Sequence, residues 1–579
     1  MKKIIYIVVS VLMFTSCDDY LDTSNYTEKN TANYPQTLVD AQQVITGIYN
    51  NLNVVCANPQ KSFFYASELA ADDRLGGGGD NDNLMQALDL LMNYNSNMLE
   101  QFWSDRYVGV FRANTAIETL GNCTGYDSDD QKNQMMGESY FLRAFYYYEL
   151  ASLFGNVPLV ITTEAVNLPK ASAAEEWGQI IQDLKTAIEL MPAKKYNTGW
   201  IEEGHVDRWC AEALMARAFL FYTGYYQVDD IVLPDGTTKV TKDDVIGWID
   251  DCVENSGYSL VSDYRNLWAY TNRLTVDDYD YTKGQGLTWV ENDNGINSES
   301  MFEIKFSQLA SWSTTIGYAN GYALHFGMRG GQDYGNTFPF GQGWGAGPVA
   351  PNLWDDWKTA EPNDMRRAAS ICNIPDELPD YTKGGWADFV QETDYYEKKM
   401  SPITCKNSAS TSGYRATFEY DMYSGFSSDN MQLNNIHDMV LIRFADVLLM
   451  QSELKQDITG INKVRTRAGL DLITSYSDAA LQNERRWELC FEGVRWNDIR
   501  RWHIAETALA EQINQPTYHA GIPDKNASQG VGYVTRYKET GGFFKIPENQ
   551  ISLSNGVLIQ NDGWDTSDSN YTSWTATGR

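Results

Sequence analysis

Basic residues are scarce in this sequence relative to acidic ones. Lysine and arginine together number 45 of the 579 residues, against 77 aspartate and glutamate residues, so the formal net charge is −32 at pH 7. Nucleic acids and anionic membrane surfaces attract proteins that carry clustered positive charge. The composition therefore argues against a nucleic-acid partner, and we expect none.

Paired cysteines and clustered histidines are also missing. No two of the eight cysteines form a CxxC motif, and the five histidines include no HExxH motif. Disulfide frameworks are typical of short secreted chains, and zinc sites need closely spaced ligands. We therefore expect the cysteines after Cys17 to be small core residues. We predict no cofactor and no metal site, although the sequence leaves a structural calcium ion open.

A long apolar run is absent beyond the first residues. Met1, Lys2 and Lys3 precede an apolar stretch from Ile4 to Phe14. This stretch has about 11 residues, whereas a membrane-spanning helix needs roughly 20. The layout is that of a cleaved secretory signal peptide, residues 1–16. Small residues directly before a cysteine resemble the lipobox of bacterial lipoproteins, so we predict that Cys17 is acylated and anchors the chain to a membrane. The alternative is an ordinary secreted protein cleaved near Ser16.

Aromatic residues, in contrast, are abundant. The chain has 17 Trp, 36 Tyr and 22 Phe, which together make 13% of the sequence. Tryptophan and tyrosine are too large and too numerous here to fit entirely in a core. Some of them should therefore lie at the surface.

Helical patterns dominate the first and last parts of the chain. The clearest predicted helix covers residues 131–154 and ends at Gly155. A small–large–small pattern within it, at Ala144, Tyr148 and Ala151, returns at residues 211–218 and 445–452. This pattern is similar to the second helix of tetratricopeptide repeats, but the spacing between copies is irregular. We expect a mainly α fold in which helix pairs are interrupted by long insertions.

The middle of the chain has a different composition. Residues 256–435 are rich in Gly, Asn, Asp, Tyr and Trp and have few periodic runs, which predicts loops with short strands. Just before this region, Asp235 and Gly236 predict a β-hairpin turn, and Thr241 with Asp244 predicts a helix N-terminus. Helical patterns resume at Met439 and continue to about Trp502. We expect a single body, residues 17–579, whose segments are N-terminal helical repeats (17–255), a loop-rich ligand-binding region (256–435) and C-terminal helices (436–579).

Several ordered motifs resemble the SusD/RagB family. Residues 484–502 read ERRWELCFEGVRWNDIRRW, which is similar to that family's ERxxEL-xxEGxRWxDxxRW signature. Residues 442–450 and 462–470 resemble its preceding helices, and residues 544–547 resemble its IP-containing segment. Its LRA and GxxPL elements are matched at residues 142–144 and 155–159.

The resemblance implies a SusD-like α-helical scaffold with four tetratricopeptide-like helix pairs and irregular loops with short β-hairpins that bind ligand. It also implies a partner, a SusC-like TonB-dependent transporter, and a cell-surface position in the outer membrane. The expected function is glycan binding for nutrient uptake without catalysis. A peptide ligand of the RagB type, or a glycoside hydrolase activity, remains an alternative.

The signature itself contains acidic residues that could be catalytic. Arg485, Glu488, Glu492 and Arg495 have the spacing of one helical face, so alternating ion pairs could form along it. The alternative is that Glu488 and Glu492 are paired carboxylates of a glycosidase. We favour the structural interpretation, because each acid has an arginine neighbour that would keep it ionised. We therefore predict no catalytic residue.

Candidate ligand-binding residues come from the loops. Sugars present apolar C–H faces, so flat aromatic side chains on exposed loops are suitable platforms, and we select Trp268, Trp289, Trp312 and Trp344. Each of them could instead be a packing anchor. Residues 72–83 form the second candidate, because four consecutive glycines disfavour regular structure and the neighbouring Asp73 and Arg74 can bind hydroxyl groups. This segment could instead be a solvated turn.

Overall fold

The computed structural model describes residues 34–79, 82–292, 295–313, 315–329, 334–384, 391–527 and 531–564. Residues 1–16 and Cys17, the expected signal peptide and lipidation site, lie outside the described residues. None of the helices in these ranges is long and apolar enough to cross a membrane.

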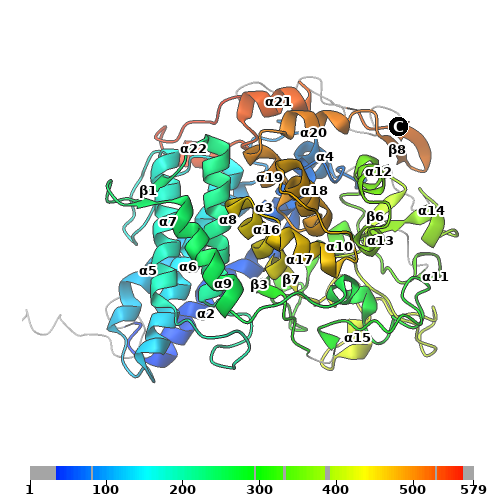
Figure 1. Cartoon of the computed structure of the whole chain (residues 1–579), viewed down its shortest axis with the longest axis horizontal. Coiled ribbons are helices and arrows are strands. Elements are labelled where there is room, and N and C mark those ends of the chain that lie inside the picture. The colour runs from blue at the N-terminus through cyan, green and yellow to red at the C-terminus, as the bar shows by residue number, and fades with distance from the viewer. Residues whose placement is uncertain are drawn as a thin grey trace, which may run out of the picture.

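Long helices pack side by side in the N-terminal half, at the left of Figure 1. Each of these helices contacts the next one of the group along the chain. The six helices are α2 (Leu38–Cys56), α5 (Glu100–Thr119), α6 (Asp129–Phe154), α7 (Ala173–Leu190), α8 (Arg208–Tyr226) and α9 (Lys242–Asn255).

Local sequence signals explain where these helices begin and end. Reciprocal capping boxes start α2, α7 and α9, and the last of them is the predicted pair Thr241 and Asp244. Gly155 ends α6 as predicted, with a φ of 70° that favours glycine. The predicted hairpin is also confirmed: β1 (Ile231–Val232) pairs antiparallel with β2 (Lys239–Val240).

The C-terminal helical region is less continuous than expected. It opens with a strand, β7 (Met439–Arg443), and the helices are separated at residues 490–494, where Phe491 and Gly493 have φ of 67° and 75°. The prediction that helical structure resumes at Met439 is therefore wrong, because residues 439–443 form a strand, whereas the helices expected up to about Trp502 follow it. The helices are α16 (Phe444–Lys455), α17 (Thr459–Arg467), α18 (Asp478–Leu489), α19 (Arg495–Arg501) and α20 (Ala505–Glu511).

Four helix pairs form the scaffold, namely α5 with α6, α7 with α8, α9 with α16, and α17 with α18. Residues 256–443 are inserted between the two helices of the third pair. Helices α16 and α17 approach closely, since a Cβ on Gly460 of α17 would meet the Leu448 carbonyl oxygen of α16 at 1.9 Å, and Ser452 of the repeat pattern also lies at this contact. The expectation of a mainly α fold with interrupted helix pairs is confirmed.

The inserted region consists of short elements joined by loops, at the right of Figure 1. Strand β3 (Ser300–Ile304) pairs antiparallel with β7, which joins the insertion to the C-terminal helices. The remaining elements here are α10 (Gly321–Phe326), α11 (Tyr334–Thr337), α12 (Pro351–Ala360), α13 (Met365–Ser370), β4 (Ile371–Asn373), α14 (Ile374–Glu377), β5 (Gln391–Glu392), β6 (Tyr395–Glu397) and α15 (Glu419–Met422).

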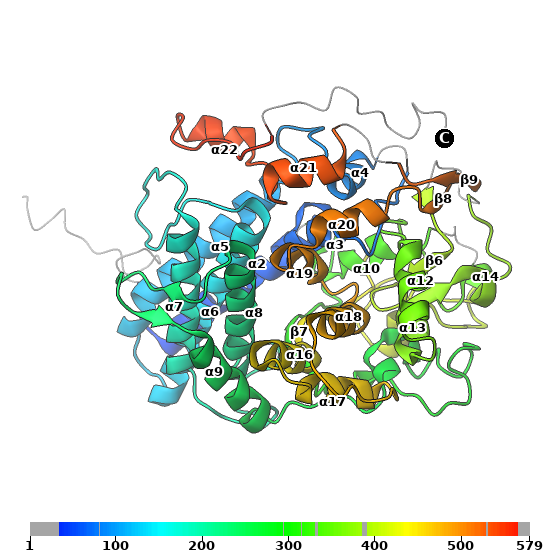
Figure 2. The same cartoon turned by 45° about the horizontal axis from the view of Figure 1, so that its top comes forward.

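The C-terminal segment of the described chain packs against the region of α4, far earlier in the sequence. Figure 2 shows the C-terminal α21 near α4. The Nδ2 of Asn93 donates to the carbonyl oxygen of Trp564 at 3.1 Å. The elements are α3 (Phe63–Ala70), α4 (Asn83–Asp89), β8 (Pro516–His519), β9 (Ile522–Lys525), α21 (Tyr533–Thr540) and α22 (Glu548–Leu553).

One hydrophobic core extends through the helical scaffold, and a separate cluster fills the insertion. All seven cysteines of the described residues are buried and unpaired, which confirms that they act as small core residues. They are Cys56, Cys123, Cys210, Cys252, Cys372, Cys405 and Cys490.

Candidate functional site

Asp73 and Arg74 do not lie on an exposed loop. Their exposed fractions are 2% and 0%. Arg486 Nε donates to Asp73 Oδ1 at 2.7 Å, and Arg74 Nε donates to Glu68 Oε2 at 2.7 Å. The expectation that these side chains face solvent is therefore wrong. Buried charges must be paired, and both residues are paired inside the protein.

The glycines after Arg74 pair with a second glycine-rich segment, residues 341–347. Leu75 N donates to the Pro348 carbonyl oxygen at 3.0 Å, and Gly78 N donates to that of Gly345 at 2.8 Å. A Cβ on Gly77 would lie 2.3 Å from the Gly345 oxygen, so the two backbones approach closely only because neither carries a side chain. The predicted solvated turn is, in its described part, a buried backbone contact.

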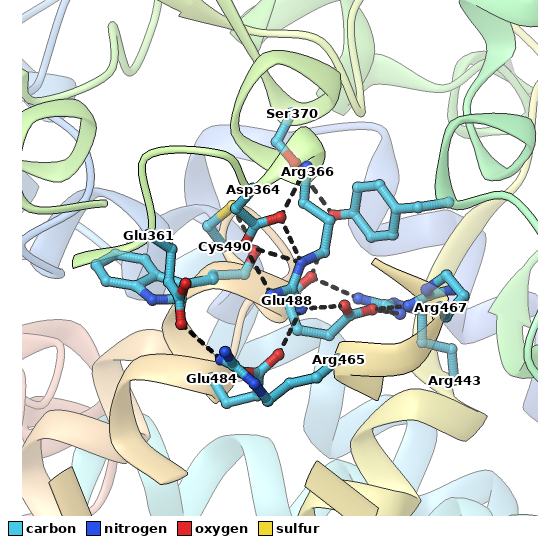
Figure 3. Close-up of polar contacts among 12 residues, drawn as sticks. Glu361, Asp364, Arg366, Ser370, Arg443, Arg465, Arg467, Glu484, Glu488 and Cys490 are labelled. Carbon is cyan, nitrogen blue, oxygen red and sulfur yellow. Dashed lines mark hydrogen bonds and ion pairs between the residues drawn. The ribbon is translucent and has the colours of Figure 1, made fainter. Parts of the chain in front are cut away.

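The family-like signature forms a buried ion-pair network (Figure 3). Glu488 is fully buried and accepts from Arg366 at 2.9 Å, and it also pairs with Arg443 and Arg467. Burial by itself would raise the pKa of Glu488, but Arg467, Arg443 and Arg366 outweigh it and hold the pKa well below its usual range. A carboxylate held ionised in this way has no proton to donate. The geometry agrees with the structural interpretation.

The ion pairs of this network do not lie along a single helical face. Because the chain turns after Leu489, Glu492 and Arg495 leave the face that carries Arg485 and Glu488. Glu492 accepts from Lys399 Nζ at 2.7 Å, whereas Arg485 Nη1 donates to Asp446 Oδ1 at 2.7 Å. The prediction of alternating pairs along a single face is wrong. The partners come from elements far apart in the sequence.

The four selected tryptophans fall into different environments. Trp268 and Trp289 are 9% and 3% exposed and belong to the core of the insertion, whereas Trp312 is 58% exposed. Trp344 is half-buried, with its ring centroid 4.4 Å from that of His325, whose pKa burial lowers to about 3. Trp268 and Trp289 line one small cavity together. Their role in ligand binding remains a prediction.

Trp289 also lines a much larger cleft of about 650 Å³. Its walls come from residues 196–207 between α7 and α8, from residues 289–308 around β3, and from residues 423–438 before β7. Phe306 and Gln308 of the loop that leads to Trp312 also line it. The cleft therefore brings Trp289 close to the exposed loop of Trp312, whereas Trp344 lies with the glycine segments.

One wall of the cleft comes from a segment that the sequence criteria did not select. Tyr196 stacks on Tyr258 with ring centroids 4.1 Å apart, and its hydroxyl donates to the Asn297 carbonyl oxygen at 2.9 Å. Trp200 follows on the same loop and lines the cleft. Glycines, acids and a tryptophan are as dense in residues 199–204 as in the loop-rich middle, and this composition could have identified the segment.

Carboxyl groups share one lysine at the floor of the cleft. Lys305 Nζ lies 2.8 Å from Glu203 Oε1, 3.2 Å from Glu303 Oε1 and 2.5 Å from Asp438 Oδ2. Burial, together with the Glu303 carboxylate, raises the pKa of Asp438 to about 7. Burial and the carboxylates of Asp438 and Glu303 raise the pKa of Glu291 well above its usual range. The single ammonium group of Lys305 cannot balance the charge of all these carboxyl groups.

The polar side chains of the cleft are suited to binding hydroxyl groups and organic cations. Across the described ranges, no group of three or more His, Cys, Asp or Glu side chains is placed to hold a metal ion. Aromatic faces at Tyr196, Trp200 and Trp289 lie beside hydrogen-bond acceptors. This combination of flat apolar surfaces and polar groups is what a sugar ring requires.

Comparison with known proteins decides the family. A family model described as "SusD family" matches residues 269–564, and a second, described as "Starch-binding associating with outer membrane", matches residues 19–222. The chain belongs to the SusD family. The resemblance read from the sequence motifs is thereby confirmed.

Relatives and solved structures of SusD-like proteins match nearly the whole chain. "SusD-like protein P2" of Formosa agariphila is 24% identical, covering 89% of this chain and 94% of the relative. A "Laminarin binding SusD-like protein" has a TM-score of 0.65 and 22% identity, covering 91% of this chain and 99% of the other. "Surface glycan-binding protein A from Bacteroides thetaiotaomicron in complex with laminarihexaose" has a TM-score of 0.65 and 20% identity, covering 91% and 100%. These structures establish that the fold is SusD-like.

The cleft lies where the two family matches adjoin. Residues 196–207 belong to the match that ends at residue 222, Tyr258 lies between the two matches, and the other lining residues belong to the SusD family match from residue 269. The ion-pair network lies within the second match. Within this SusD fold, the ion-pair network connects helices to one another. The cleft is a separate surface that a ligand could occupy.

Proposed function

We propose that this SusD-family protein is a cell-surface lipoprotein that binds glycans and delivers them to a SusC-like TonB-dependent transporter. The observation that carries the proposal is the cleft of about 650 Å³ with aromatic walls on a SusD fold. A cleft of this volume lies in the usual range for small-ligand sites.

Two further observations support a glycan as the ligand. The names of two structurally similar proteins specify laminarin and laminarihexaose, although both are below 25% identity to this chain. Trp312, four residues after Gln308 of the cleft lining, is 58% exposed, which is unusual for a side chain that normally gains most from burial. Asp73 and Arg74 are left out of this site because they are buried in ion pairs.

The anchor and the transporter are inferred from the sequence and the family. The predicted lipobox places the acyl chains on Cys17, and two or three acyl chains hold a soluble domain firmly on a membrane. Replacing Cys17 by alanine should release the protein from the membrane fraction. Protease added to whole cells should digest the wild-type protein if it faces the exterior, and full protection would contradict this orientation.

The main competing ligand is a peptide, as in RagB-like proteins, and the less favoured alternative is glycoside hydrolysis. Native gel electrophoresis in the presence of laminarin, starch and other polysaccharides tests the proposal. We expect at least one polysaccharide to retard the wild-type protein without releasing reducing ends during long incubation. Retardation by none of them would overturn glycan binding, and release of reducing ends would overturn the non-catalytic role.

The same gels can locate the binding surface. Replacing Trp312 by alanine should reduce retardation, whereas replacing Leu553, which is 73% exposed on α22, should not. Both changes remove an exposed apolar side chain, so their difference reports on position rather than on surface hydrophobicity. The transporter partnership is tested by co-purification with a tagged SusC-like protein from membranes.

A further inference from the structure

The cleft carries a strong imbalance of charge. Within the described part of its lining, Lys305 is the sole lysine or arginine. His205 also lines the cleft, and although burial would lower its pKa, the carboxylates of Glu138 and Glu202 raise it. Six carboxyl side chains share this lining, namely Glu202, Glu203, Asp207, Glu291, Glu303 and Asp438. Burial raises the pKa of Asp207, Glu291 and Asp438, so part of this group is protonated and the negative charge is centred on the other acids. Low-dielectric walls focus the field of such a cluster, so a cation is attracted into the cleft and an anion is repelled.

The protein itself compensates only part of this charge. Lys305 divides its ammonium among Glu203, Glu303 and Asp438, and the side chain of Glu203 stays 75% exposed. Asp207 is occupied differently, since it caps α8 and accepts from the Tyr258 hydroxyl at 3.1 Å. Acceptor atoms therefore remain available at the cleft surface for a ligand that brings its own positive charge.

A buried histidine adds an independent polar group to the same cleft. His437 lines the cleft and is 5% exposed, and its Nδ1 lies 2.9 Å from Glu419 Oε1. Its Nε2 has no hydrogen-bond partner among the residues that the structure describes. In the neutral ring, the carboxylate at Nδ1 favours the tautomer that carries its proton there, and Nε2 then offers a lone pair. An unpaired buried acceptor is costly, and a donor from a ligand would satisfy it.

We infer that the cleft is selective for glycans that carry a protonated amine, as in an unacetylated amino sugar, over neutral glycans, and that it rejects carboxylated or sulfated ones. This inference rests on the proposed glycan-binding function and names its substrate class. The aromatic walls favour a sugar over a basic peptide. Tyr196, held in its stack on Tyr258, and Trp200 are half-buried in the cleft wall and can contact the C–H surface of a ring, and aromatic faces also attract cations.

The test compares two chains that differ only in acetylation. Binding of a β-1,4-linked glucosamine pentamer and of its N-acetylated counterpart is measured by calorimetry near neutral pH, with laminarin and a lysine-rich peptide as further ligands. We expect the amine-bearing pentamer to bind about tenfold more tightly or better, which corresponds to about 1.4 kcal/mol. The difference should shrink at high salt because screening weakens charge attraction.

Variants assign the effect to the cleft. Glu203→Gln should weaken binding of the amine-bearing pentamer about three- to tenfold and weaken binding of the acetylated pentamer clearly less, because the amide removes the charge but keeps an acceptor oxygen. Glu203 is an exposed loop residue, so its change does not threaten folding. Asp438→Asn should act in the same direction. Glu189→Gln is the matched control, because its side chain is 60% exposed on α7 and does not line the cleft.

The outcomes separate the two proposals. Equal binding of both pentamers, or an unchanged preference in Glu203→Gln, overturns the charge selectivity and leaves glycan binding intact. Tighter binding of the lysine-rich peptide than of any glycan overturns the sugar assignment. Binding of laminarin alone refutes the amine preference but supports the proposed function, and binding of no glycan at all refutes both.

Discussion

Arg495 and Asp72 form a buried, bidentate ion pair. They lie 423 residues apart in the sequence. Arg495 Nε donates to Asp72 Oδ1 and Nη2 donates to Oδ2, both at 2.7 Å. Asp72 follows α3 and Arg495 begins α19, so this pair joins the N-terminal part to the C-terminal signature. Planar guanidinium and carboxylate groups match well in this arrangement.

Breaking this pair should destabilise the fold strongly. Asp72→Asn removes the carboxylate that pairs with Arg495 and leaves that buried charge uncompensated, whereas Arg486 keeps Asp73 and Asp356, so we expect the free energy of unfolding to fall by about 3–5 kcal/mol. Urea unfolding followed by tryptophan fluorescence measures the change. Glu189→Gln, at an exposed pair on α7, should stay within about 0.5 kcal/mol of wild type. Similar losses for both variants would contradict the structural role of the Arg495–Asp72 pair.

Asp446 should contribute to the acid sensitivity of the protein. Burial would raise its pKa, but Arg485 and Arg217 outweigh this and lower the pKa to about 2, below its value of about 3.9 in the unfolded chain. The stability from this group is therefore fully present above about pH 4 and is lost as the pH falls through about 2. We expect the difference in melting temperature between wild type and Asp446→Asn to narrow as the pH is lowered. A constant difference between neutral pH and about pH 3 would disprove this assignment.

Two glycine substitutions should have opposite effects. Gly77 has a φ of 69°, and a Cβ there would lie 2.3 Å from the Gly345 carbonyl oxygen, so Gly77→Ala should lower stability by at least about 1–3 kcal/mol. Gly247 is exposed within α9 and has open space around it, so Gly247→Ala should raise stability by roughly 0.5–1 kcal/mol. Calorimetric melting of both variants checks the prediction. A stabilising Gly77→Ala would show that the two glycine segments are not packed together.

The thiol groups provide a test of both the core and the anchor. Burial raises the pKa of the Cys56 thiol to about 12, and the other six described cysteines are buried as well. None of the seven should react with a thiol reagent while the protein is folded. An unprocessed protein made without lipidation should show one fast-reacting thiol, Cys17, and the mature membrane form should show none. A second fast thiol in the folded protein would contradict the buried core.

The tryptophans should differ in their effects on ligand binding and stability. Trp268→Ala removes a core side chain of the insertion and should cost about 3–5 kcal/mol of stability. Trp312→Ala should leave the melting temperature nearly unchanged and reduce polysaccharide retention, because the side chain is mostly exposed. Paired thermal melts and native gels separate the two effects. Loss of retention without loss of stability in Trp268→Ala would assign that residue to the ligand instead.

Local signals in the sequence determined much of the scaffold. The capping pair Thr241 and Asp244, the helix end at Gly155 and the hairpin at Asp235 depend on neighbouring residues only, so a single sequence was enough to predict them. The family signature was equally readable, because it is a continuous string of residues. The burial of the cysteines followed from their scattered positions.

Tertiary structure alone decided the partners of the charged residues and the location of the cleft. The spacing of the charged residues in the signature suggested ion pairs along one helix. In the structure, Arg485 pairs with Asp446, Glu488 with Arg443 and Arg495 with Asp72, and these partners come from other elements. Likewise, the exposure of Arg74 could not be read from its glycine neighbours, since those glycines make room for the second segment that buries it. The prediction that Cys17 is acylated comes from the sequence by itself. The cleft exists only because residues 196–207 fold back against β3 and β7, and such long-range contacts leave no periodic pattern in a single chain.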